Sequence, residues 1–103
     1  MARVRLSRRA EDDLYNIGLY TLGTWGEAQA ERYILQLEQC CRLLADNPAL
    51  GRPCNNVRPG LHRMEQGKHV VFYRVDRGGI LISRILHQRM LPERQAIDDE
   101  DDD

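Results

Sequence analysis

Lysine is almost missing from this sequence, since Lys68 is the only one among its 15 basic residues and the other 14 are arginine. This excludes a cluster of lysines as a phosphate-binding surface. Arginine differs from lysine because its planar guanidinium forms two parallel hydrogen bonds with one carboxylate or phosphate. The sequence therefore favours a partner that presents acidic groups.

Long hydrophobic runs are also missing. No apolar stretch approaches the roughly 20 residues that a membrane-spanning helix needs. The first 13 residues, MARVRLSRRAEDD, do not contain the apolar core of a secretory signal. Hydrophobic residues make up 42% of the chain and charged residues 30%, which is typical of a folded globular protein. We therefore expect a cytoplasmic protein with no membrane partner.

Cysteine is scarce and unpatterned. Cys40 and Cys41 are adjacent and Cys54 stands alone, so the three form neither a disulfide framework nor a zinc site. His62 and His69 also lack the spacing of a metal-ligand pair. We expect no metal, no cofactor and no small-molecule ligand.

Negative charge is distributed unevenly, because residues 98–103, DDEDDD, hold 6 of the 16 acidic residues. Residues 1–97 then contain 15 basic and 10 acidic residues, a net charge of +5. A chain of this length has room for one core. We therefore predict a single domain over residues 1–97 and a disordered acidic tail over residues 98–103. The alternative is that the tail folds back and screens the basic face.

The first half of the chain predicts two helices. Ser7 has the position of an N-cap for the first helix, which we expect to end at Gly23. Thr24 and Glu27 have the spacing of a capping box for the second helix, which stops before Pro48. Apolar residues of the second helix recur at helical spacing at Ala30, Tyr33, Ile34, Leu37, Cys41 and Leu44. The short connection predicts an antiparallel hairpin of helices.

The second half of the chain predicts strands. RVRLS, near the start, alternates like a short strand, and LHRMEQ, HVVFYRV and ILISRILH read as a three-stranded antiparallel meander. The order of elements is β-α-α-β-β-β. We therefore predict an α+β fold in which a helical hairpin packs on a small antiparallel sheet.

Both faces of the predicted sheet are partly apolar. Strict alternation places Val71 and Phe72 on opposite faces of one strand. It likewise separates Ile82 from Ile85 on the next strand. A helical hairpin covers only one face, so we expect the other face to be a protein-binding surface. The alternative is that both faces pack internally and arginines such as Arg74 extend to water.

Five stretches of the sequence resemble one known family: LSRRAEDDL, TWGEAQAERY, NPALGRP, GKHVVFYRV and ISRILHQRM. With the order of elements, they look like the ParE branch of the RelE/ParE toxin superfamily, over residues 3–92. The resemblance implies a RelE/ParE-like fold and a bacterial type II toxin that is neutralised by a ParD-like antitoxin. ParE-type toxins act on DNA gyrase, and operator DNA is bound by the antitoxin. RelE-type relatives instead cleave mRNA on the ribosome.

The choice between these two activities depends on catalytic groups. Cleavage of RNA at the 2′-hydroxyl requires a proton acceptor, a proton donor and cations for the phosphate. The resemblance aligns Val70 with an arginine of the nuclease branch, and no tyrosine follows Tyr73. His87 is the only candidate acid or base near the right place. We therefore predict no catalytic residues and a non-enzymatic inhibitor of DNA gyrase.

Two alternatives remain from the sequence. One is a RelE-type, ribosome-dependent mRNA endoribonuclease, with His87 as acid or base and Arg84 and Arg89 as phosphate-binding groups. The other is a plain nucleic-acid-binding module, which the positive charge of residues 1–97 allows. Such a module usually stacks bases on an aromatic pair of one strand face, and the sequence shows no such pair.

Two surfaces are expected to meet protein partners. Basic and apolar side chains near the end of the last strand are expected to face DNA gyrase: Arg84, His87, Arg89 and Met90. Apolar and aromatic side chains of the helical hairpin are expected to bind the antitoxin: Tyr15, Leu19, Leu22 and Trp25. For Trp25 the alternative is packing in the corner between the two helices.

Overall fold

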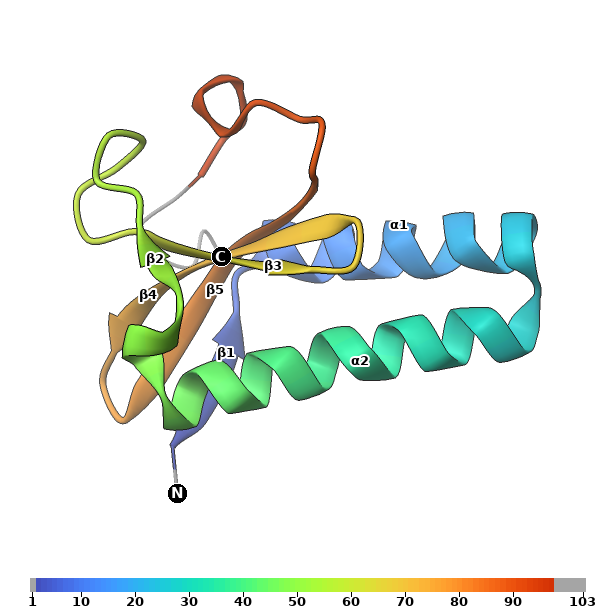
Figure 1. The fold of residues 1–103 in the computed structure, drawn as a ribbon, viewed down its shortest axis with the longest axis horizontal. Coiled ribbons are helices and arrows are strands. Elements are labelled where there is room, and N and C mark those ends of the chain that lie inside the picture. Colours follow the sequence, from blue (N-terminus) through green and yellow to red (C-terminus); the bar gives the residue numbers. More distant parts are fainter. Residues whose placement is uncertain (1, 98–103) are drawn as a thin grey trace.

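The computed structural model describes residues 2–97, and the predicted acidic tail over residues 98–103 lies outside the described residues. Two long helices form a hairpin that packs on a sheet and extends beyond it (Figure 1). The elements are β1 (Arg3–Leu6), α1 (Arg8–Trp25), α2 (Glu27–Asp46), β2 (Arg52–Pro53), β3 (His62–Gln66), β4 (His69–Asp76) and β5 (Gly79–His87), with short 3-10 helices at Pro48–Leu50 and Pro92–Arg94. The predicted α+β fold is confirmed. Neither long helix has the apolar composition needed to cross a membrane.

The sheet is mixed rather than wholly antiparallel. Its strand order is β1-β5-β4-β3-β2, and β3, β4 and β5 form the predicted antiparallel meander. The two-residue strand β2, which pairs with β3, was not predicted. β1 pairs with β5 in parallel, which the sequence did not predict. The side-chain alternation of a short strand shows which residues share a face but not the direction of the neighbouring strand. β1 consequently forms one edge of the sheet.

Ser7 begins α1 and ties it to the sheet. Its hydroxyl accepts a hydrogen bond from Ala10 N at 3.0 Å and donates one to Ser83 O at 2.8 Å. Ser7 is buried, so both bonds are shielded from water. The predicted N-cap is confirmed, and the same side chain anchors the start of α1 on β5.

The end of α1 differs from the prediction. The helix continues through Gly23 to Trp25, and Gly26 separates it from α2 with a φ angle of 93°. Glycine adopts this left-handed conformation without the steric cost that a side chain adds. Thr24 therefore lies inside α1, and no side chain caps α2. The predicted capping box is wrong because Gly26 makes the turn.

Two cores fill the two faces of the sheet. The core beneath the helices includes Ala10, Ile17, Leu37, Cys41, Leu44, Val71, Tyr73, Ile80, Ile82 and Ile85. The second core contains Cys54, Leu61, Val70, Phe72, Leu86 and Ile97. Val70 and Phe72 alternate with Val71 and Tyr73, so this core lies on the opposite face. The expectation that one face stays open for a partner is therefore wrong, because the loop after β2 and the segment that ends at Ile97 cover it.

A bulge in β5 decides which of its side chains face the helices. Phe72 of β4 pairs with Arg84, but the next residue, Tyr73, pairs with Ile82, so Ser83 has no partner of its own. Ile82 and Ile85 consequently both join the core beneath the helices. The predicted faces of this strand are wrong after Ser83, because one extra residue shifts the alternation.

Candidate functional site

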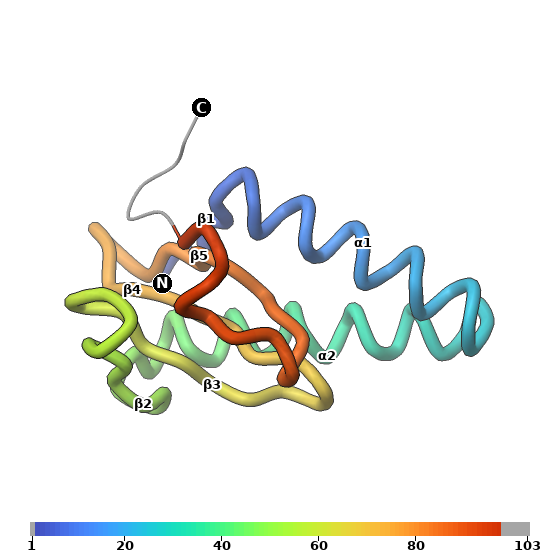
Figure 2. The backbone as a smooth tube through the Cα atoms, turned by 90° about the horizontal axis from the view of Figure 1, so that it is seen from above, coloured from blue at the N-terminus to red at the C-terminus, as the bar shows by residue number. Residues whose placement is uncertain are grey.

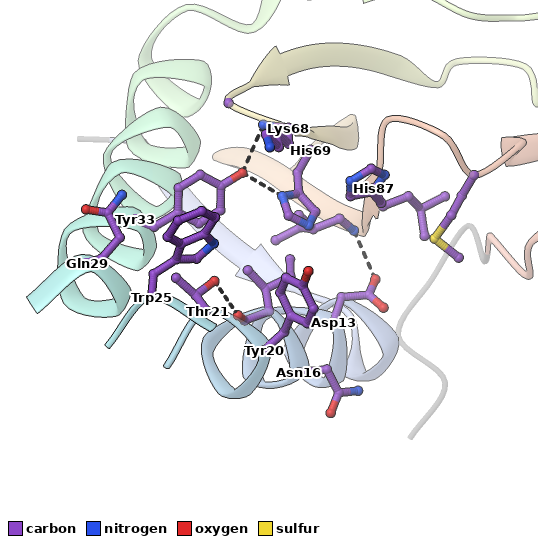
Figure 3. Close-up of a pocket in the computed structure, with 15 residues that line it drawn as sticks. Asp13, Asn16, Tyr20, Thr21, Trp25, Gln29, Tyr33, Lys68, His69 and His87 are labelled. Carbon is purple, nitrogen blue, oxygen red and sulfur yellow. Dashed lines mark hydrogen bonds between the residues drawn. The ribbon is translucent and has the colours of Figure 1, made fainter. Parts of the chain in front are cut away.

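A groove of about 710 Å³, which we call the tryptophan groove, lies between the helical hairpin and the end of the sheet (Figure 3). Its walls include Tyr20, Trp25, Tyr33, His69, His87 and Met90. The structure thus places Trp25, expected to contact the antitoxin, in the same groove as His87 and Met90, expected to contact the target. Trp25 is 65% exposed, which does not fit packing in the corner between the helices.

Tyr33 and His69 form a polar side of the tryptophan groove. Tyr33 Oη accepts a hydrogen bond from Lys68 N at 3.0 Å and lies 2.6 Å from His69 Nδ1 (Figure 3). Burial raises the pKa of the Tyr33 hydroxyl, while burial and the nearby His87 lower the pKa of His69. Both groups are therefore neutral near pH 7. Tyr33 Oη also donates to Gln66 O at 3.4 Å, and the direction of its bond with His69 Nδ1 follows the tautomer of the imidazole.

His87 stands beside His69 at the end of β5. The two ring centroids are 5.4 Å apart in an edge arrangement. Arg89 N donates a hydrogen bond to His87 Nδ1 at 3.2 Å. A backbone N–H and a second imidazole thus orient His87.

The turn after β5 presents Arg89 and Met90 at the surface. Gln88 N donates to Lys68 O, and Met90 N donates to His87 O, both at 2.9 Å. The first bond holds the turn against the connection between β3 and β4, and the second closes the turn itself. Arg89 is exposed, and Met90 is 41% exposed to solvent. Both side chains can therefore reach a partner while β5 stays in place.

Arg84 has different surroundings from the other residues predicted to face the target. Its Nε and Nη2 donate to the two carboxylate oxygens of Asp13 at 2.7 and 2.9 Å. Its Nη1 donates to Ala96 O at 2.7 Å. The Arg84 and Asp13 side chains are only 13% and 14% exposed. Arg84 thus joins α1, β5 and the segment before Ile97, and this burial does not fit the prediction that it faces the target.

A second groove, of about 760 Å³ and called here the hairpin groove, lies between α1, α2 and β1. Tyr15, Leu19 and Leu22 line it, three of the four residues predicted to bind the antitoxin. They are 68%, 50% and 48% exposed, respectively. The structure therefore brings these three together and leaves Trp25 in the other groove.

Sequence reasoning missed Val4, Leu6 and Ile34 as members of the hairpin groove. Ile34 belongs to the apolar period of α2, which indicated a core position. Val4 and Leu6 alternate with arginines in RVRLS, and this pattern indicated that they share a face. β1 is an edge strand, so among residues 2–97 its outer backbone groups have no strand partner.

Reactive groups are few in the described part of the chain. Among residues 2–97, no three His, Cys, Asp or Glu side chains are grouped so that they could hold a metal ion. Burial raises the pKa of each cysteine thiol, to about 12 for Cys41. These thiols are protonated near pH 7 and are poor nucleophiles. The two grooves therefore combine apolar and aromatic surface with a few polar groups, as binding surfaces do.

Comparison with known proteins identifies the family. Residues 4–92 match the model of the ParE toxin of the type II toxin-antitoxin system parDE. The chain is 43% identical over 90 residues to Toxin ParE1 of Caulobacter vibrioides, covering 87% of this chain and 93% of that protein. It is 40% identical over 94 residues to Toxin ParE1 of Mycobacterium tuberculosis, covering 90% of this chain and 96% of that protein. A solved structure described as the chromosomal ParDE TA system from P. aeruginosa shares the fold, with a TM-score of 0.71 and 24% identity, covering 84% of this chain and 96% of that chain. The chain belongs to the ParE toxin family of type II toxin-antitoxin systems.

Proposed function

We propose that this toxin inhibits DNA gyrase in the cytoplasm by binding it, without catalysis, and that a ParD-like antitoxin neutralises it. The family match over residues 4–92, with two ParE1 toxins at 43% and 40% identity, is the observation that carries the proposal. Operator DNA is bound through the antitoxin. The surroundings of His87 support a binding mechanism, because an imidazole and a backbone N–H orient it.

The hairpin groove is the proposed antitoxin site. Tyr15, Leu19 and Leu22 present apolar surface along α1, and about half or more of each side chain is exposed. Exposed apolar patches of this kind usually mark protein interfaces. An amphipathic antitoxin segment that lies in the groove would bury these three side chains.

The proposed target surface combines Arg89, Met90 and His87 with Trp25. Met90, His87 and Trp25 all line the tryptophan groove, and Arg89 lies on the turn beside it. Arginine speeds encounter with an acidic surface, whereas tryptophan and methionine add contact area. Arg84 is left out of this surface because Asp13 and Ala96 bind its guanidinium.

A supercoiling assay with purified DNA gyrase tests the function. The toxin alone should inhibit supercoiling in a dose-dependent manner, and its antitoxin, added beforehand, should prevent the inhibition. Induction of the toxin in bacteria should break DNA and start the SOS response without cutting mRNA.

The opposite result would identify an endoribonuclease. If induction cuts mRNA at defined codons on the ribosome, and His87→Ala removes the cuts, the gyrase proposal is wrong. Removal of a true general acid or base usually lowers the rate about a hundredfold or more, so the variant distinguishes catalysis from contact.

A further inference from the structure

Rings from four elements lie together in the tryptophan groove. Tyr20 and Trp25 belong to α1, Tyr33 to α2, His69 to β4 and His87 to β5. The chain has one Trp, four Tyr and one Phe, so half of these six aromatic residues line the groove. The sequence showed no aromatic pair on a strand face, and the structure brings the rings together from the helices instead. Proteins use exposed rings of this kind to stack unpaired bases.

Trp25 and Tyr20 are the rings with the most exposed surface in the groove. They are 65% and 69% exposed, respectively. Tyr33, His69 and His87 contact one another, with ring centroids 5.5 and 5.4 Å apart. Within residues 2–97, no ring and no guanidinium stacks on Trp25 or Tyr20. A base that enters the groove can therefore reach both rings without displacing a stacked side chain.

Two cations lie together on the sheet side of the groove. Lys68 lines the groove, and Arg89 lies on the turn after β5. Gln88 N donates to Lys68 O at 2.9 Å, so the two turns that carry these cations lie side by side (Figure 2). Both cationic side chains are exposed, and within residues 2–97 neither forms an ion pair. Both can therefore bind a phosphate.

The groove presents little negative charge to a phosphate. Among the described residues that line it, Asp13 is the one carboxylate, and Arg84 donates to both of its oxygens. The exposed amides of Asn16 and Gln29 also line the groove. Side-chain amides form hydrogen bonds with the edges of bases. The groove thus combines rings for a base, cations for a phosphate and amides for a base edge.

An unpaired nucleotide fits this combination better than a duplex does, because in a duplex the neighbouring bases cover both faces of each base. The volume of about 710 Å³ lies in the range of small-ligand sites, about 300–1,000 Å³. We propose that the tryptophan groove binds a nucleotide of single-stranded DNA, with its base on Trp25 and its phosphate on Lys68 and Arg89. The choice of DNA rests on the proposed function, since DNA is the substrate of DNA gyrase. The groove then contacts the DNA of the gyrase complex rather than the gyrase protein.

Tryptophan fluorescence tests the groove directly, because Trp25 is the only tryptophan of the chain. A base that stacks on the indole quenches its emission. A single strand of thymidines, about 12 nucleotides long, should quench the wild-type toxin, and a duplex of equal length should leave the emission unchanged. In fluorescence anisotropy with the labelled strand, W25A should lower the affinity about tenfold. W25F keeps a ring and should lower it by less than about threefold.

The charge contribution is tested with two variants that change the net charge equally. K68Q/R89Q removes the two proposed phosphate contacts, and R77Q/R94Q changes two exposed arginines that do not line the groove. Each phosphate contact with a single strand adds about 0.7 to the slope of log affinity against log salt concentration. Measured between about 50 and 200 mM salt, this slope should decrease by about 1.4 in K68Q/R89Q and by less than about 0.3 in R77Q/R94Q.

Several results would overturn the proposal. One is the absence of quenching at up to about 0.1 mM strand, the weak end of nonspecific DNA binding. Another is an equal decrease of the slope in the two charge variants. A uridine strand bound about tenfold more tightly than the thymidine strand would identify RNA as the ligand instead. If W25A loses gyrase inhibition but keeps its affinity for the strand, the groove contacts the gyrase protein and the proposal is wrong.

The supercoiling assay separates this site from the proposed function. If the wild-type toxin inhibits gyrase without binding the strand, the proposed function stands and the DNA site is wrong. If the toxin binds the strand through Trp25 without inhibiting gyrase, the nucleotide site stands and the proposed function is wrong.

Discussion

Arg84 and Arg89 show how differently two arginines of one short segment are used. Arg84 donates three hydrogen bonds to Asp13 and Ala96, whereas the side chain of Arg89 is exposed on the turn after β5. The sequence could not separate them, because Asp13 is 71 residues from Arg84 and nothing local indicates that the two meet. It could predict only that basic groups gather at the end of the last strand.

Arg89→Glu is expected to weaken toxicity without weakening the fold. A glutamate at this position would be repelled by an acidic target, so binding should weaken. A surface substitution usually changes the free energy of unfolding by less than about 0.5 kcal/mol, so the fold should stay stable. Growth inhibition, antitoxin affinity and urea denaturation are measured on the same variant. Undiminished toxicity, or a loss of antitoxin affinity, would remove Arg89 from the target surface.

Arg84→Met provides the contrast. It leaves Asp13 largely buried without its cation, so the free energy of unfolding should fall by about 2–4 kcal/mol. The double variant Asp13→Leu with Arg84→Met should lose less than the sum of the single variants, because no charge remains unpaired. If Arg84→Met were as stable as Arg89→Glu, the ion pair between Arg84 and Asp13 would contribute nothing to the stability of the fold.

His69 makes stability depend on pH. Its pKa in the folded protein is lowered, by burial first and by His87 second. The unfolded chain, with a histidine pKa of about 6.5, therefore binds a proton more readily. The free energy of unfolding should fall as the pH decreases below about 6.5, over a range that lies above the titration of carboxyl groups. Urea denaturation between about pH 7.5 and 5.5 measures this slope, which should be smaller in His69→Gln.

Among the elements, α1 lines both grooves. Tyr15, Leu19 and Leu22 line the hairpin groove, while Tyr20 and Trp25 line the tryptophan groove. A helix has several sides, so one element can meet the antitoxin on one side and the target on another. The two partners need not compete for the same side chains.

Leu19→Asp should lower antitoxin affinity about tenfold or more, because a charge replaces an apolar contact in the hairpin groove. Leu43→Asp is the matched control, since Leu43 is 49% exposed on α2, Leu19 is 50% exposed, and Leu43 lines neither groove. Isothermal titration with the purified antitoxin compares the two. Equal affinities would place the antitoxin elsewhere.

The elements also show what the sequence could predict. The N-cap at Ser7 and the apolar period of α2 are local signals, and both are confirmed. The turn at Gly26 was missed because Thr24 and Glu27 imitate a capping box. The parallel pairing of β1 and the bulge at Ser83 depend on residues far apart in the chain, so no local pattern could reveal them.

For the whole molecule, the main departure from prediction is that both faces of the sheet are covered. The prediction considered only helices and strands, which are too few to cover both faces. In the structure the loop after β2 supplies Cys54 and Leu61 to the second core, and the irregular segment after β5 supplies Ile97. The partner surfaces proposed here are therefore the two grooves beside the hairpin, and the toxin does not need its antitoxin to complete a core.

The second core should make Ile97 important for stability, although it lies beyond the family match that ends at residue 92. Ile97→Ala removes a side chain that is 2% exposed, so the free energy of unfolding should fall by about 2–4 kcal/mol. Leu91→Ala is the control, because Leu91 is 52% exposed and its loss should cost less than about 0.5 kcal/mol. Urea denaturation of the toxin without its antitoxin measures both. Equal stabilities would mean that the fold is complete without Ile97, and that the segment after residue 92 only rests on the sheet.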